Sequence, residues 1–150
     1  MSGFVNPKER YKYLNKLGHS ISPKTILCSF KVSGNHLAIK DHVFVNDWTY
    51  LDTTGGTITL DENVHLAQRA TVLTSSHSIG ERPELRCGKP ETSPTTIGKG
   101  SWIGSGAIIL PGANVAPGCV IAAGAVVTSP TRPNGLYAGV PARRIRDLPV

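Results

Sequence analysis

The chain of 150 residues is 39% hydrophobic and 6% aromatic, and it contains 16 glycines. A membrane-spanning helix is excluded because no apolar run approaches about 18 residues, and the N-terminus lacks the apolar segment of a signal peptide, so we expect a soluble, cytoplasmic protein with no membrane insertion. The formal net charge of +6 permits a nucleic-acid partner, but the scattered basic residues lack interleaved aromatic ones, so we expect no nucleic acid.

The three cysteines, Cys28, Cys87 and Cys119, are an odd number at unrelated spacings. They form neither a disulfide framework nor a paired-cysteine zinc motif. We therefore expect no disulfide and no metal.

Residues 1–20 are predicted to form a short helical cap that covers the open end of the structure behind them. Asn6 suits an N-cap, Pro7 the first helical position and Gly18 a C-terminal stop. The apolar residues that would then share one helix face are Tyr11, Leu14 and Leu17.

From residue 21 onward, the position that is usually aliphatic recurs every six residues. The first series is Ile21, Leu27, polar Ser33, Ile39, Val45 and Leu51. A slip of three residues between Thr53 and Thr57, which contains two glycines, resets the series to Leu60, Leu66 and Val72. We interpret the slip as a corner loop between two coils of a solenoid.

The period stops after Val72, and residues 78–96 carry charges and prolines without an aliphatic pattern. This segment is an excursion loop, and long loops inside compact repeats are more often functional than neutral.

The period is strongest between Ile97 and Val127, where every sixth residue is aliphatic. Four places after each of the first five aliphatic residues stands a small one, and a glycine lies between the two. A period of six fits neither an α-helix nor a half-buried strand, but it is typical of a parallel β-helix with three hexapeptides in each coil. The aliphatic and small side chains would fill the inside of a triangular prism.

The tail begins at a proline-rich exit, and Pro141 is predicted to start a helix that runs to Leu148. The predicted organisation is therefore a cap at 1–20, a solenoid at 21–130 with its excursion at 78–96, and a tail with a short helix at 131–150.

His77 is the main candidate for chemistry, because it follows three hydroxyl-bearing residues at the edge of the excursion. Histidine is the usual general base at neutral pH, so His77 is either a general base or a plain surface residue. A zinc site from His36, His42, His65 and His77 is the alternative, but His36 and His42 lie at the fourth position of their blocks and would not face a shared cleft.

A lane of small outward residues is predicted beside Trp102, which precedes an inward isoleucine and should point away from the prism. The lane comprises Gly104, Ser105, Ala122 and Ala123, and a long thin ligand could lie there close to backbone N–H groups. The arginines near the C-terminus (Arg132, Arg143, Arg144 and Arg146) suit a small polyanion.

These motifs resemble the hexapeptide-repeat acyltransferases with a left-handed β-helix, and most closely the maltose, galactoside and nodulation-type sugar O-acetyltransferases. The resemblance covers about Ile39 to Leu148. It rests on TSSH at 74–77, ERPELRCGKP at 81–90, TTIGKGSWIGSGAIILPG at 95–112, IAAGAVVTSP at 121–130 and AGVPARRIR at 138–146.

The resemblance implies an all-β fold, the left hand of the coil and an acetyl-CoA-dependent O-acetyltransferase that acts on a sugar-like hydroxyl. His77 matches the general base, and Asn46 looks like the acceptor-site asparagine, with Asp47 as its competitor. The matches to coenzyme A contacts are Trp102, Gly104, Ser105, Ala123, Thr128, Arg143 and Arg146. The family also implies a homotrimer whose active sites lie between subunits.

The chain departs from the family at two points. Only about 20 residues precede the coil, which leaves the acceptor open, and Ser129 stands where a lysine is common. Acetyl transfer to an amino sugar, a zinc lyase of the carbonic-anhydrase type and a non-catalytic scaffold remain alternatives.

Overall fold

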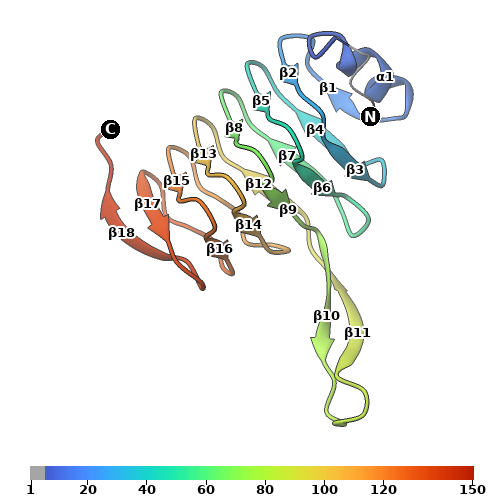
Figure 1. Cartoon of the computed structure of the whole chain (residues 1–150), viewed down its shortest axis with the longest axis vertical. Helices are drawn as coiled ribbons and strands as arrows, with labels where there is room; N and C mark the ends of the chain where they lie inside the picture. The colour runs from blue at the N-terminus through green and yellow to red at the C-terminus, as the bar shows by residue number, and fades with distance from the viewer. Residues whose placement is uncertain (1–5) are drawn as a thin grey trace.

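The computed structural model describes residues 6–150, so the first five residues of the expected cap lie outside the described residues. The chain winds into a triangular solenoid whose three faces are parallel sheets, and one hairpin projects from its side (Figure 1). Sheet A contains β1 (Ser20–Ile21), β4 (Leu37–Ile39), β7 (Ile58–Leu60) and β12 (Thr95–Ile97).

The other two faces follow the same order along the solenoid. Sheet B contains β2 (Ile26–Leu27), β5 (Phe44–Val45), β8 (His65–Leu66), β13 (Trp102–Ile103), β15 (Val120–Ile121), β17 (Gly135–Ala138) and β18 (Arg143–Asp147). Sheet C contains β3 (Lys31–Ser33), β6 (Tyr50–Asp52), β9 (Thr71–Val72), β14 (Ile108–Ile109) and β16 (Val126–Val127). Each coil therefore runs from sheet A to B to C, and we name its corners A–B, B–C and C–A.

The predicted six-residue phase is confirmed along most of the chain. Strand pairing joins Ile103 to Ile121 and Ile109 to Val127, one coil apart. The slip before Ile58 is also present, because Ile39 pairs with Leu60 across a coil that is three residues longer. The inward aliphatic residues are buried, and so are the small ones of the strong repeat, which are Ser101, Ala107, Ala113, Cys119 and Ala125.

The phase at Ser33 was predicted wrongly. Val32, and not Ser33, pairs with the inward Leu51, and Phe30 is buried two residues earlier. Burial of the Phe30 ring stabilises the fold more than burial of the Ser33 hydroxyl would, so the inward position shifts by one residue and Lys31 is exposed to solvent.

The N-terminal cap contains a helix, but it is shorter than predicted. Helix α1 (Arg10–Lys16) begins after Glu9, while Asn6 lies in the turn before it and accepts a hydrogen bond from the Lys8 amide. Leu14 is buried against the solenoid, whereas Leu17, predicted on the same face, is 64% exposed.

The predicted helix from Pro141 to Leu148 is wrong, because this segment forms β18, which runs antiparallel to β17. β17 is the last parallel strand of sheet B, and its outer edge needs backbone partners. An isolated helix of this length would be marginal, so pairing with the open edge prevails.

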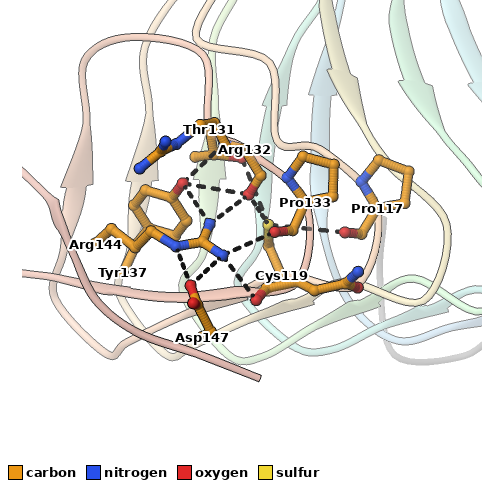
Figure 2. Close-up of polar contacts among 9 residues, drawn as sticks. Pro117, Cys119, Thr131, Arg132, Pro133, Tyr137, Arg144 and Asp147 are labelled. Atoms are coloured by element: carbon orange, nitrogen blue, oxygen red, sulfur yellow. Dashed lines mark hydrogen bonds and ion pairs between the residues drawn. The ribbon is translucent and has the colours of Figure 1, made fainter. Parts of the chain in front are cut away.

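The side chain of Arg144 fastens this last strand (Figure 2). Its guanidinium donates hydrogen bonds to the backbone carbonyls of Arg132, Pro133 and Asn134 at 2.9 to 3.0 Å and forms an ion pair with Asp147. Arg144 therefore has a structural role at the C-terminal end of the solenoid.

Within residues 6–150, none of the helices has the length and apolarity needed to span a membrane.

Candidate functional site

The predicted excursion is a β-hairpin made of β10 (Ser75–Ile79) and β11 (Cys87–Thr92), and it leaves the solenoid at the C–A corner (Figure 1). His77 lies in β10 opposite Pro90, with an exposed side chain. An exposed imidazole beside the solenoid is free to meet a hydroxyl that approaches from outside.

A buried carboxylate holds the root of this hairpin. Asp52 Oδ2 accepts a hydrogen bond from Ser75 Oγ at 2.5 Å, and its Oδ1 accepts one from Thr54 Oγ1 at 2.6 Å. Burial alone would raise the pKa of Asp52, but these hydrogen bonds outweigh burial and lower the pKa below its ordinary value. Because Ser75 and His77 are two residues apart in one strand, Asp52 anchors the face of β10 that carries His77.

A cavity of about 530 Å³ lies at the hairpin root. Its lining comprises Ser76, Glu91, Thr92, Ser93, Leu110, Pro111 and Thr128. Thr128 therefore lies near the hairpin at the C–A corner and not beside Trp102.

A second groove, of about 470 Å³, runs along the B–C corner. It is lined by Asn46, His65, Ala67, Gln68, Trp102 and Ser105. Trp102 points outward, as predicted, and is 53% exposed, while Ser105 Oγ donates to Gln68 Oε1 at 3.3 Å. The structure thus brings the candidate acceptor residue Asn46 together with two residues of the predicted lane.

Gly104 differs from the prediction, because it is buried and does not line the lane. A Cβ atom there would lie 2.6 Å from the Ala123 nitrogen and 2.7 Å from the Ile121 oxygen, both in the backbone of the next coil. Glycine is required here by the close approach of two coils. Ser105 and Ala123 are exposed on the corner, and Ala122 is partly exposed.

The backbone amides of this corner divide into two groups. The amides of Gly104, Gly106, Ala122 and Gly124 donate to neighbouring coils at 2.8 to 2.9 Å. In the described part of the chain, no such ladder bond is made by the amides of Ser105 and Ala123. These two amides are the ones that a ligand in the lane could reach.

Asn46 and Asp47 have different environments. Asp47 Oδ1 accepts the Ser29 amide at 2.8 Å, which commits this carboxylate to the turn. Asn46 Oδ1 accepts a hydrogen bond from the Asp47 amide at 2.8 Å, and Asn46 lines the groove together with Trp102. Asn46 is therefore the better candidate for contact with an acceptor.

The two predicted phosphate-binding arginines share a face of β18. Arg143 pairs with Ala138 and Arg146 with Leu136, while an irregularity in the pairing leaves Ile145 between them. Both arginines are exposed, on the side of sheet B that also carries Trp102. Arg144 faces the other way, toward Tyr137, and is fully engaged (Figure 2).

Among residues 6–150, no three His, Cys, Asp or Glu side chains gather in a way that could hold a metal ion. The four histidines of the zinc alternative are therefore not brought together within one described chain.

Sequence reasoning missed two residues of the B–C corner, Trp48 and Arg69. Both have a positive φ, at 63° and 60°, and strand pairing aligns them with Gly106 and Gly124 of later coils. The sequence does place both residues in line with these glycines, but the alignment is visible only when the three-residue slip and the hairpin are left out of the count.

The fold and these grooves define a hexapeptide-repeat solenoid, and comparison with known proteins agrees. Residues 94–129 match the family model described as bacterial transferase hexapeptide (six repeats). No curated protein matches the chain in sequence.

Three solved structures are similar over nearly the whole chain. A maltose O-acetyltransferase from Clostridium difficile 630 is 27% identical, with a TM-score of 0.82 over 99% of this chain and 80% of its own. A hexapeptide-repeat acetyltransferase from Vibrio cholerae O1 biovar eltor, complexed with acetyl-CoA, is 30% identical, with a TM-score of 0.79 over 95% of this chain and 78% of its own. A galactoside acetyltransferase in complex with coenzyme A is 28% identical, with a TM-score of 0.67 over 98% and 75%.

The chain belongs to the hexapeptide-repeat acetyltransferase family. Its solenoid is accordingly the left-handed parallel β-helix, as the resemblance in sequence implied.

Proposed function

We propose that this protein is an acetyl-CoA-dependent O-acetyltransferase that acts in the cytoplasm on a hydroxyl of a sugar-like acceptor. The observation that carries the proposal is the B–C corner, where Asn46, Trp102 and Ser105 line one groove. The similar structures with bound acetyl-CoA or coenzyme A support the same co-substrate for this chain.

Coenzyme A would lie along the B–C corner with its phosphates at the C-terminal end. Arg143 and Arg146 would meet the phosphates, because both are exposed on β18 and guanidinium groups pair well with phosphate. From β13 to β18 there are three strand steps, or about 14 Å, which suits an extended pantetheine arm. The thioester would then reach Ser105, with Trp102, Ala122 and Ala123 along the arm.

His77 would act as the general base in a direct transfer. Its imidazole removes the proton from the acceptor hydroxyl while the oxygen attacks the thioester carbonyl. The Ser105 amide would stabilise the resulting oxyanion, and collapse of the tetrahedral intermediate expels the coenzyme A thiolate, which takes up a proton. The products are an acetyl ester and coenzyme A, and no covalent enzyme intermediate is required. Asn46 would orient the acceptor.

We further propose that the active site is shared between subunits of a homotrimer. The hairpin with His77 leaves from the C–A corner, whereas Trp102 and Ser105 flank the B–C corner, which supports a site built from two chains. Thr128 would then reach coenzyme A from the same chain as His77. An outward column on sheet B supports a buried subunit contact, since it consists largely of apolar side chains: Ile26, Phe44, His65, Trp102, Val120 and Leu136.

The activity is tested by incubating the protein with acetyl-CoA and a panel of sugars, nucleotide sugars and amino sugars. Release of free coenzyme A together with an ester-bearing sugar, identified by mass spectrometry, is the expected result. Transfer only to amino sugars would replace O-transfer by N-transfer. Absence of transfer combined with absence of coenzyme A binding would contradict the proposal.

The shared site is tested by mixing two inactive variants, His77→Ala and Ala123→Trp, the second of which fills the exposed lane with a large side chain. After joint refolding, about a quarter of the sites in a random trimer would combine an intact His77 with an intact lane. Recovery of activity to about that fraction of the wild-type value supports the shared site. Recovery of none, in mixed trimers that light scattering confirms, would contradict it.

A further inference from the structure

The B–C corner changes character along the solenoid. One residue per coil adopts a left-handed conformation there, and in the later coils it is Gly106 (φ 67°) and Gly124 (φ 68°). In the two earlier coils the same position is occupied by Arg69 (φ 60°) and Trp48 (φ 63°). The lane is thus open along the coils proposed to bind coenzyme A and is walled by two large side chains in the coils that carry Asn46 and Gln68.

Trp48 is unusual at such a position. A positive φ is uncommon outside glycine, asparagine and aspartate, and for a bulky aromatic residue it is an outlier that local structure must compensate. The side chain is nevertheless 74% exposed, so burial in the solenoid core does not explain it. Folding alone would be served better by glycine, as in the later coils.

The turn that carries Trp48 is held firmly by the preceding coil. The Trp48 amide donates to the Ser29 oxygen at 2.6 Å, and the Asp47 carboxylate accepts the Ser29 amide at 2.8 Å. Next to the indole lies a cavity of about 390 Å³ lined by Ser29, Phe30, Lys31, Trp48, Thr49 and Tyr50. The backbone of the turn is therefore held in place, and the exposed indole beside the cavity is suited to stacking against a flat apolar ring face.

Positive charge lies on both sides of this indole. Lys31 Nζ lies 5.3 Å from the centroid of the Tyr50 ring, which forms part of the same cavity. Arg69 is exposed one coil further on, and within residues 6–150 it forms no salt bridge. The carboxylate of Asp47, next to Trp48 in sequence, is already committed to the Ser29 amide.

Arg69 also connects this cavity to the proposed reaction centre. Its neighbour in sequence, Gln68, accepts the hydrogen bond of Ser105 and lines the groove with Asn46. A ligand held by Trp48 and Arg69 would therefore extend directly from an acceptor bound at Asn46.

We propose that Trp48, Arg69 and Lys31 form an acceptor subsite for a saccharide that carries an anionic group. A sugar ring lies against the indole of Trp48, and its carboxylate or phosphate pairs with Arg69, with Lys31 as the second cation. This inference rests on the proposed acetyl transfer to a sugar, and it adds that the acceptor is acidic.

Two glycine substitutions test the subsite without a loss of folding. Trp48→Gly and Arg69→Gly install the residue that later coils use at the same position, so the melting temperature should stay constant or rise. His42→Gly and Asn63→Gly are matched controls, because both residues have a positive φ, at 59° and 58°, at the A–B corner.

The probes are methyl glucuronide and glucose 6-phosphate, each compared with its neutral counterpart. The wild-type protein should prefer an acidic probe, and Arg69→Gly should raise the Michaelis constant for that probe by about tenfold or more, the effect of one lost charge-assisted contact. Trp48→Gly removes the stacking surface and should raise the Michaelis constants for the acidic probe and the neutral sugar together. The Michaelis constant for acetyl-CoA should change little in both variants, that for the neutral sugar should change little in Arg69→Gly, and the controls should match the wild type. The two acidic probes distinguish carboxylate from phosphate recognition.

Three results would overturn the subsite: transfer to neutral sugars without an acidic preference, an acidic preference that Arg69→Gly retains in full, or loss of the oligomer in Trp48→Gly. The last would assign the indole to a subunit contact. Direct binding of the acidic probes, measured by calorimetry, separates this proposal from the proposed function. Binding that depends on Arg69 but leads to no acetyl transfer would support the subsite and contradict the acetyltransferase.

Discussion

Substitution of Gly104 tests why this glycine is required. The Cβ atom of Gly104→Ala would lie 2.6 to 2.8 Å from three backbone atoms of the next coil, in Ile121, Ala122 and Ala123. A normal contact for this atom is 3.4 Å or more. The two coils must therefore separate by roughly 0.7 Å, because backbone atoms cannot rotate away as a side chain can.

The separation has a calculable cost. The hydrogen bond from the Gly104 amide to the Ile121 oxygen, 2.8 Å long, would stretch to about 3.5 Å, where it is largely lost. Overpacking costs about 1 to 3 kcal/mol and the lost bond about 1 kcal/mol, so the free energy of unfolding should fall by about 2 to 4 kcal/mol. Because Ala122 and Ala123 move as well, the affinity for coenzyme A should fall with it.

Thermal unfolding and calorimetric titration with coenzyme A measure both effects. Gly100→Ala is the control, since a Cβ there meets nothing within 4 Å and carries only the strain of a positive φ, about 1 to 2 kcal/mol. If Gly104→Ala were no less stable than Gly100→Ala and bound coenzyme A normally, the close approach of the coils would not be the reason for this glycine.

Two further predictions concern the arginines of β18 and the histidine of the cap. Arg143→Ala should raise the Michaelis constant for acetyl-CoA about tenfold and leave the melting temperature unchanged, whereas Arg144→Ala should lower the melting temperature. Steady-state kinetics and thermal unfolding measure the two effects, and the prediction is contradicted if Arg143→Ala lowers the melting temperature while Arg144→Ala raises only the Michaelis constant. Burial lowers the pKa of His19 and the nearby charge of His36 lowers it further, so the unfolded chain binds more protons and the free energy of unfolding should decrease as the pH falls below about 6.5. In denaturant titrations at several pH values, the free energy of unfolding of His19→Asn should depend less on pH than that of the wild type. An unchanged pH dependence would mean that another group causes it.

The fold could be predicted from the sequence because a solenoid repeats its core. From Ile97 to Val127 every sixth residue is aliphatic and buried, so each hexapeptide gives independent evidence for the same fold. The first coils were harder, since Phe30 displaces the expected phase at Ser33 and only the gain from burial decides between them. The tail at Pro141 was mispredicted because its local signals favour a helix, while the edge of β17 that captures it is a tertiary feature.

The candidate site was predictable residue by residue but not in its arrangement. Trp102 and Ser105 could be placed on the outside from the period alone, and the structure agrees. The position of Asn46 in the same groove depends on coils far apart in sequence. The structural role of Arg144 depends on carbonyl groups whose directions no local pattern encodes.

The measurement that tests the proposed mechanism most directly is the turnover of His77→Ala with acetyl-CoA and a sugar acceptor. Loss of a general base typically reduces turnover by about 10² to 10⁴-fold. Since His77 is exposed on the hairpin, the variant should keep its melting temperature, its oligomeric state and its affinity for coenzyme A. Ser78→Ala, next to it in β10, is the control and should remain active. A fall of less than about tenfold in a folded variant that binds coenzyme A would show that His77 is not the base.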